Sequence, residues 1–316
     1  MNKSKRILVA ALAAIPGAAA FACASCGCSL SSDWGSQGVS STPGLRMDLR
    51  LDYLNQNEVR SGTSKVGTWP ISGHEQELYT ENTYLTAAFD YGFNEDWGIT
   101  VQLPYVVRNH ATNGQNFDGS DAGTSRTSSI GDVKLIGRYM GLTESRNFGI
   151  QFGVKLPMGS YTETFSGGAI AGQALDRGLQ PGTGTTDLIV GAFYFDSLSQ
   201  NWDYFVQGLY QTPTNSRDDY KPGDSLNLNV GFRYMALEKV IPQIQINART
   251  SNKDSGANAT PDDSGGQTVY LSPGVTVPVS EKVKVYGFIQ VPIFQNLNGY
   301  QLAPTYTVSL GTRIDF

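Results

Sequence analysis

Three cysteines near the amino terminus are the residues with the clearest capacity for chemistry. Cys23, Cys26 and Cys28 are all 3 cysteines of the protein, and they lie in the stretch CASCGCSLSSDW. Three thiolates at this C-x-x-C-x-C spacing could bind a soft metal such as Cu(I) or Zn²⁺. In an oxidising compartment the same residues could instead form one disulfide and leave one thiol. The cysteines are therefore a candidate metal site, and the sequence suggests no other cofactor.

Other candidates for chemistry are few. The 2 histidines are His74 and His110, and both fall in stretches that we expect to be solvated loops. The Gly-rich segment PGTGTTD (181–187) lacks the lysine and the following helix of a phosphate-binding loop, so it predicts a loop-to-strand transition. A lipid hydrolase would need a serine and a histidine near the outer edge of its fold, and His110 alone could take that part. We therefore predict that the chain is not an enzyme.

The segment before the cysteines determines the compartment. Cations within the first six positions precede the apolar run Ile7 to Ala22, which is too short to cross a bilayer and ends in small residues. This pattern predicts a secretory signal peptide over 1–22, followed by a periplasmic arm over 23–43. Two alternatives stay open: cleavage after Ala24, which would remove Cys23, and attachment of a lipid to Cys23.

Composition and charge argue against two classes of protein, helical membrane proteins and nucleic-acid-binding proteins. Charged residues make up 16% of the chain, against about 25% in an ordinary soluble domain. No stretch after the signal peptide approaches the roughly 20 apolar residues of a membrane helix. The formal net charge of −5 includes the cations of the signal peptide, which argues against nucleic acid as a partner.

Apolar and polar residues alternate in about twelve segments between 44 and 316. In LRMDLRLDYL (45–54) the apolar side chains lie on one side and the arginines and aspartates on the other, and the last such segment is YTVSLGTRIDF. A period of two is typical of a strand whose faces meet unlike environments. Two segments, 187–195 and 202–210, are apolar on both faces, so their register stays open.

The links between these segments alternate in length. Short links at 93–96, 235–239 and 279–282 take turns with long Gly-, Ser-, Asp- and Asn-rich links near 55–82, 109–129, 157–186, 211–225, 250–267 and 294–304. Bacterial outer-membrane barrels have short periplasmic turns and long external loops, and closure satisfies every backbone hydrogen bond within the sheet. We therefore predict an all-β fold, a single antiparallel transmembrane β-barrel of about 12 strands over 44–316, in the cell outer membrane of a Gram-negative-type bacterium.

The two faces of such a barrel meet different surroundings. The apolar face would contact outer-membrane lipid, because a lysine or arginine directed at the bilayer midplane costs about 2–4 kcal/mol. The predicted pore-lining residues are Arg46, Asp48, Arg50, Asp132, Lys134, Arg138, Arg233, Arg249, Lys284, Tyr286 and Phe288. Rings beside charges suit an amphipathic solute such as an aromatic acid. The alternative is that opposite charges pair across neighbouring strands and the rings fill space.

Several short motifs resemble a known family. GDVKLIGRY, GVKLPMGS, LQPGTGTTDLIVGAFY, VYLSPGV and FIQVPIFQNLNGYQLAPTYTVSLGTRIDF are similar, in order and spacing, to the outer-membrane transporter family named after the meta-pathway of phenol degradation. The resemblance runs from about Arg46 to Phe316. It implies a small outer-membrane channel, often assumed to pass aromatic or other hydrophobic compounds, and it transfers no catalytic residues. The last strand with Phe316 also resembles the signal that outer-membrane assembly machinery recognises.

Three function classes follow from these observations. The leading prediction is an outer-membrane channel or transporter for small solutes, with aromatic or amphipathic compounds as candidates. Twelve strands would give a lumen wider than that of an eight-stranded barrel and narrower than that of a 16- to 18-stranded porin. The alternatives are a structural barrel whose cysteine arm docks a periplasmic redox partner, and a barrel-embedded lipid hydrolase.

Overall fold

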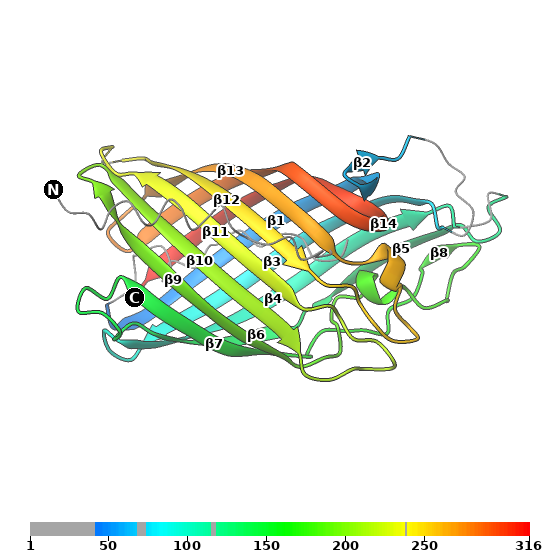
Figure 1. The fold of residues 1–316 in the computed structure, drawn as a ribbon, viewed down its shortest axis with the longest axis horizontal. Helices are drawn as coiled ribbons and strands as arrows, with labels where there is room; N and C mark the ends of the chain where they lie inside the picture. The colour runs from blue at the N-terminus through cyan, green and yellow to red at the C-terminus, as the bar shows by residue number, and fades with distance from the viewer. Residues whose placement is uncertain (1–41, 68–73, 115–117, 238) are drawn as a thin grey trace.

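The computed structural model describes residues 42–67, 74–114, 118–237 and 239–316, which form one closed β-barrel (Figure 1). Within these ranges, 11 strands make up the wall and 3 lie outside the ring. The wall consists of β1 (Gly44–Gly62), β3 (Glu77–Gly92), β4 (Trp97–Thr112), β6 (Val133–Tyr139), β7 (Phe148–Leu156), β9 (Asp187–Ser199), β10 (Trp202–Pro213), β11 (Ser225–Tyr234), β12 (Ile241–Ser251), β13 (Gly266–Pro278) and β14 (Val283–Asp315). The other strands are β2 (Ser64–Lys65), β5 (Gly123–Ile130) and β8 (Gly167–Gly168), and two 3-10 turns are η3 (Arg177–Leu179) and η4 (Pro261–Asp263). No helix in the described ranges is long and apolar enough to span a membrane.

The ring closes between its first and last strands. All wall pairings are antiparallel, and β1 pairs with β3 on one side and with β14 on the other. β14 crosses the wall twice, because residues 284–297 pair with β13 whereas the later residues up to 315 pair with β1. The backbone N–H of Asp315 donates to the carbonyl oxygen of Lys282 at 2.8 Å, which joins the two arms. Because β14 crosses the wall twice, the 11 wall strands make twelve crossings, the number of strands predicted from the sequence.

Connection lengths differ between the two rims, as predicted, but the strands are longer than expected. β1 continues to Gly62 and β14 runs through 294–304, in stretches expected to be loops, and β5 occupies part of the expected loop 109–129. Beyond the membrane a strand can be polar on both faces, so the hydrogen-bonded ladder continues where the apolar alternation stops. The rim with short turns, where the carboxyl terminus lies (Figure 1), is the periplasmic rim of such barrels.

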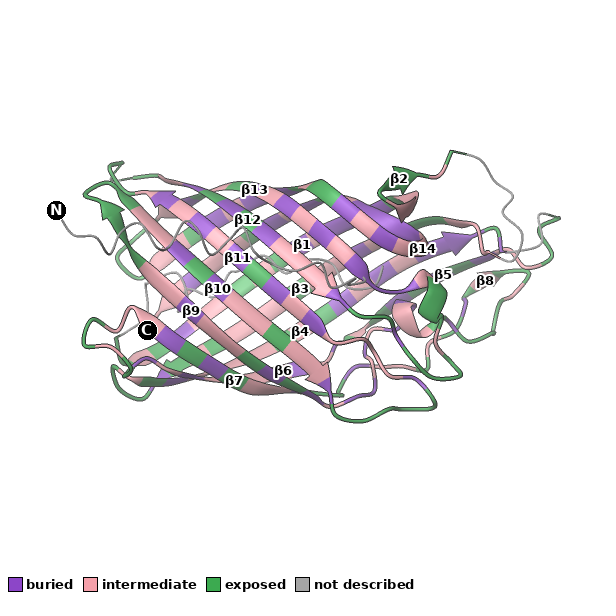
Figure 2. Cartoon of the chain, viewed as in Figure 1, coloured by how far each residue is buried: buried purple, intermediate pink, exposed green. Residues whose placement is uncertain are grey.

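The outer face forms an apolar belt. Buried and exposed bands alternate along the strands (Figure 2), and outward Leu49, Leu85 and Ile246 are 37%, 42% and 44% exposed. At the periplasmic rim the rings of Trp97 and Tyr139 lie 4.6 Å apart, as expected of an interfacial aromatic girdle. Because this belt can face only hydrocarbon and the wall has no open edge, the fold is that of an outer-membrane protein.

Aromatic rings and glycines alternate on the inner face. Four rings each lie over a glycine of the neighbouring strand or arm: Phe193 over Gly149, Phe205 over Gly231, Phe288 over Gly274 and, between the two arms of β14, Tyr286 over Gly311. A Cβ at any of these glycines would collide with the ring, so the absence of a side chain there makes room for the ring, as in aromatic rescue of strand glycines. These pairs also fix the inward face of β9 and β10, whose register the sequence left open.

Candidate functional site

Charged side chains at the periplasmic end of the lumen are paired with one another. Asp90 accepts a hydrogen bond from Arg46 at 2.8 Å and also contacts Arg138. On the opposite wall, Arg233 lies 3.3 Å from Asp203. The predicted pore cations Arg46, Arg138 and Arg233 therefore meet carboxylates across strands, which is the alternative that the sequence analysis left open.

In the middle of the lumen, charges and rings lie together. Arg50 donates to Asp52 at 2.7 Å, and the hydroxyl of Tyr286 donates to Asp48 at 2.9 Å. The ring of Phe288 lies 6.1 Å from that of Tyr286. Four of the predicted lining residues thus form one inward cluster, in which the rings are buried.

A belt of amides crosses the opposite wall, and the sequence analysis missed it. The Ser272 hydroxyl donates to Asn247 at 2.6 Å, Asn247 donates to Asn229 at 2.8 Å, and Asn229 donates to Gln207 at 3.3 Å. Gln207 then donates to Gln151 at 2.9 Å, across β9, where Gln151 lies opposite Gly191 and Gln207 opposite Phe193. All the amide side chains are buried, so this part of the lumen is filled with hydrogen-bonded groups. The inward run Q-I-Q-I-N at 243–247 is the signal from which the belt could have been predicted.

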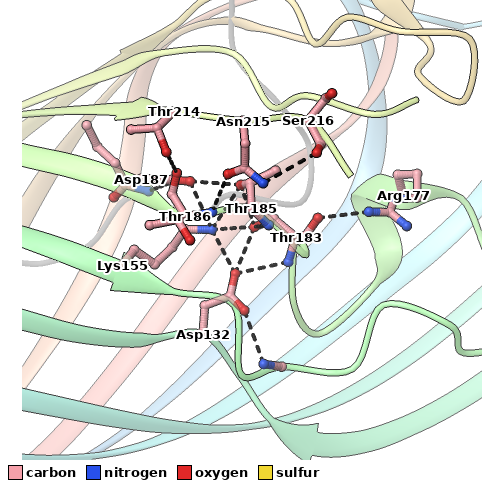
Figure 3. A network of polar contacts seen from close by, with 12 residues as sticks. Asp132, Lys155, Arg177, Thr183, Thr185, Thr186, Asp187, Thr214, Asn215 and Ser216 are labelled. Atoms are coloured by element: carbon pink, nitrogen blue, oxygen red, sulfur yellow. Dashed lines mark hydrogen bonds and ion pairs between the residues drawn. The ribbon is translucent and has the colours of Figure 1, made fainter. Parts of the chain in front are cut away.

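A buried ion-pair cluster anchors the connection between β7 and β9, which we call loop 157–186. The ammonium of Lys155 lies 2.8 Å from Asp132 and 3.3 Å from Asp187, and the three side chains are 5%, 8% and 2% exposed. Asp132 also accepts from the backbone N–H of Gly159 at 3.1 Å and of Thr183 at 3.0 Å. The carboxylate of Asp132, directly before β6, therefore holds both ends of the loop against the wall (Figure 3). Asp132 is one of the predicted pore-lining residues, and in this structure it bonds to other residues of the protein.

Arg108, on the inner face of β4, contacts the same loop further along. Its Nη1 donates to the carbonyl oxygens of Gly178 at 3.2 Å and Gln180 at 3.3 Å, and its Nη2 donates to the Tyr84 hydroxyl at 3.3 Å. The side chain is 3% exposed. Among the described residues no carboxylate lies within 4.0 Å of this guanidinium. Arg108 is thus a buried cation with neutral acceptors.

Arg108 also belongs to a hydrogen-bonded chain across three strands. Its Nε donates to Asn82, Asn82 donates to Gln56 at 2.8 Å, and Gln56 donates to the carbonyl oxygen of Leu302 at 3.0 Å. The chain joins the β14 hairpin to loop 157–186 through β1, β3 and β4. Two external connections are therefore coupled through buried side chains.

The motifs that meet around Asp132 are those that carried the sequence resemblance. GDVKL supplies Asp132, GVKLPMGS supplies Lys155 and Gly159, and PGTGTTD, which leads into β9, supplies Thr183 and Asp187. The family model described as "Putative MetA-pathway of phenol degradation" matches residues 55–293. The chain belongs to this family. The resemblance found in the sequence is thereby confirmed.

Solved structures similar to this member of the phenol-degradation family are outer-membrane barrels. An outer membrane channel from Pseudomonas putida F1 has a TM-score of 0.65 at 14% identity, covering 87% of this chain and 96% of that one. The CymD monoaromatic hydrocarbon channel has a TM-score of 0.50 at 12% identity, covering 92% and 95%. The β domain of the Bordetella autotransporter BrkA has a TM-score of 0.53 at 11% identity, covering 87% and 100%. At these identities the likeness shows the fold. No curated protein matches the sequence.

Loop 157–186 of this family member has its own small core. Phe165, Leu175 and Leu179 are buried against one another, with Ile170 packed on them. Arg177 lies 4.9 Å from the ring of Tyr220, in the next external connection. The loop is thus an ordered cover that lies against the external end of the lumen.

His110 lies beneath this cover. Its Nδ1 is 2.9 Å from the Thr80 hydroxyl, and its ring lies 6.3 Å from that of Phe165. The side chain is 1% exposed, so the expectation of a solvated loop histidine is wrong. β4 extends to Thr112, beyond the point where its apolar alternation ends, and this extension carries His110 into the lumen. His74, which we also expected to be solvated, lies half-buried at 3.2 Å from Asp263.

The remaining predicted site residues are placed as follows. Lys134 and Lys284 lie half-buried on the inner faces of β6 and β14, and Arg249 donates to Asn227 at 3.1 Å. That any lining residue contacts a solute stays a prediction. Cys23, Cys26 and Cys28 lie outside the described residues, as does the signal peptide, so the metal site stays a prediction too. Elsewhere, the described residues contain no group of three His, Cys, Asp or Glu side chains suited to a metal.

Proposed function

We propose that the protein is an outer-membrane channel for small aromatic or amphipathic solutes. The observation that carries this proposal is a closed barrel whose inner face is polar and charged while its outer face is apolar, with an ordered loop against its external end. A family named for phenol degradation, and a fold shared with a monoaromatic hydrocarbon channel, support aromatic compounds as the solute class.

The packing of the lumen indicates a narrow and selective passage. Gln207, Gln245 and Gln290 point inward and are at most 2% exposed, so other side chains almost fully cover them. A solute must therefore displace side chains or loop 157–186 as it passes. Small solutes and low conductance follow from this arrangement, in contrast to the open water-filled lumen of large porins.

The external end of the barrel is better suited to transport than to lipid hydrolysis. The side chain of His110 faces the lumen and is covered by loop 157–186, so it cannot contact a phospholipid outside the wall. A hydrolase embedded in the wall needs its base beside the lipid. A docking role for the cysteine arm remains a separate prediction, because residues 23–41 lie outside the described part of the chain.

Reconstitution tests the channel directly. Vesicles that contain folded protein are expected to swell faster in isosmotic phenylalanine or sodium benzoate than in a sugar of similar size, and planar bilayers should show small conductance steps. Heat-dependent migration on gels verifies folding, and vesicles with heat-unfolded protein are the control. Folded protein that gives neither swelling nor conductance would refute the proposal. Phospholipid hydrolysis that is lost in His110→Ala would favour the enzyme instead.

A further inference from the structure

The buried guanidinium of Arg108 lies near the external end of the lumen, and the proposed channel function does not explain why this charge is there. We propose that Arg108 is the centre of a binding site for the carboxylate of an aromatic or amphipathic solute, and that loop 157–186 covers this site when no solute is bound. This proposal rests on the proposed channel function and adds that the solutes carry a carboxylate.

Apart from the close bond of its Nε to Asn82, the partners of Arg108 are weak for a buried charge. Buried cations are normally paired with carboxylates, because desolvation of an unpaired charge is costly. Here Gly178, Gln180 and Tyr84 provide neutral oxygens at 3.2, 3.3 and 3.3 Å, beyond the usual 2.7–3.2 Å range of such bonds or at its upper end. A carboxylate would accept two parallel bonds from the same guanidinium at about 2.7–2.9 Å. Replacement of the loop carbonyls by a solute carboxylate is therefore favourable for Arg108.

Two further polar groups near Arg108 have no hydrogen-bond partner. Thr127 is the residue of β5 directly opposite Arg108, and His110 lies two positions along the same inner face of β4. The Thr127 hydroxyl and the Nε2 of His110 are buried without a partner, and the two side chains are 2% and 1% exposed. When the Thr80 hydroxyl donates to Nδ1, the neutral ring carries its proton on Nε2. Both groups can then donate to an anion held by Arg108, which would remove the cost of burying them unpaired.

The attachment of the loop suggests how the site opens. Gly178 and Gln180 lie in the middle of loop 157–186, whereas Asp132 holds its two ends near Gly159 and Thr183. A carboxylate that takes the place of the two carbonyls would release the middle of the loop and leave its ends fixed. Binding of the solute would thus open the loop over the lumen, while the ion pairs of Lys155 keep the ends of the loop on the barrel.

Calorimetric titration of the full-length protein in detergent tests the site. We expect the wild type to bind benzoate and to discriminate against benzamide, its neutral counterpart. Arg108→Gln should weaken benzoate binding about tenfold or more, as expected for loss of a charged hydrogen-bond donor. Arg126→Gln is the matched control, because it removes the same charge from the neighbouring strand β5, where Arg126 is exposed on the face opposite to that of Thr127. It should change benzoate affinity less than twofold.

Loop release gives a second measurement that needs no variant. Arg177 is the only tryptic site within 157–186, and benzoate, but not benzamide, should accelerate cleavage there in the wild-type protein. This measurement keeps the proposal falsifiable if Arg108→Gln does not fold.

Four results would overturn the binding site. They are equal benzoate affinity in wild type and Arg108→Gln, equal losses in the Arg108 and Arg126 variants, absence of benzoate binding in a protein that conducts, and tryptic cleavage that benzoate does not change. The third result would leave the channel function intact, whereas absence of conductance and swelling would remove both.

Discussion

Replacement of Lys155 by methionine tests whether the buried ion pairs hold loop 157–186 in place. The change removes the ammonium and leaves the carboxylates of Asp132 and Asp187 buried, at 8% and 2% exposure. Removal of one partner from a buried ion pair costs about 3–5 kcal/mol. The wall ladder does not depend on this contact, so we expect the cost to appear as detachment of the loop.

Tryptic cleavage at Arg177 measures this detachment. When opening is fast, the cleavage rate follows the open fraction, and about 3 kcal/mol corresponds to a rise of roughly 150-fold. Lys253→Met is the control, because Lys253 and Asp262 form an exposed pair, with side chains 39% and 92% exposed, and such a pair contributes at most about 1 kcal/mol. Adding Asp132→Asn to Lys155→Met should restore part of the protection, because one buried unpaired carboxylate is gone. A cleavage rate in Lys155→Met within twofold of wild type would show that the loop is held by other contacts.

Three further outcomes are expected. Glu75 precedes β3, and burial, together with the charge of Asp176 in loop 157–186, raises the pKa of Glu75. Protonation of Glu75 therefore stabilises the closed loop; this stabilisation is complete below about pH 4.3 and is lost as the pH rises through the raised pKa. Channel openings should be rarer at pH 4 than at pH 7, and a pH response that persists in Glu75→Gln would contradict this. Gly274→Val places a side chain into the ring of Phe288 and should lower the free energy of unfolding, measured in urea titrations, by about 1–3 kcal/mol. Gly67→Ala is the control: nothing lies within 4 Å of its new Cβ, so the free energy of unfolding should not fall. Leu49→Arg on the apolar belt should cost about 2–4 kcal/mol in folding from urea into lipid vesicles, and an unchanged midpoint would show that this position lies outside the hydrocarbon.

The wall of the barrel was predictable because its signal is local. In 45–54 each residue is assigned to one of two faces by its parity alone, and the apolar face meets lipid as expected. The rule failed where the surroundings changed. Val133 has the parity of the lipid face but is 6% exposed. Apart from Val59, the strand residues of 55–62 carry no apolar side chain on either side, because they extend beyond the membrane.

The site was less predictable because its contacts join distant positions. That Lys155 meets both Asp132 and Asp187 depends on the register of β7 against β6 and β9, and alternation within one strand carries no information on register between strands. The same holds for Arg108, whose partners Gly178 and Gln180 lie in a loop without any periodic pattern. Short motifs marked these positions in the sequence, but the motifs gave no geometry.

The pairing of β1 with the second arm of β14 has a consequence for how the protein is made. Leu51 lies opposite Leu310, so the pairing that closes the ring joins segments from the two ends of the described chain. Until this pairing forms, the sheet has two edges with unpaired N–H and carbonyl groups, which are sites of aggregation. The entropy of closing so long a loop grows only slowly with length, but such distant contacts form slowly. A chain that lacks the second arm therefore cannot close its sheet, and we expect its edges to remain open to aggregation until β1 and β14 pair.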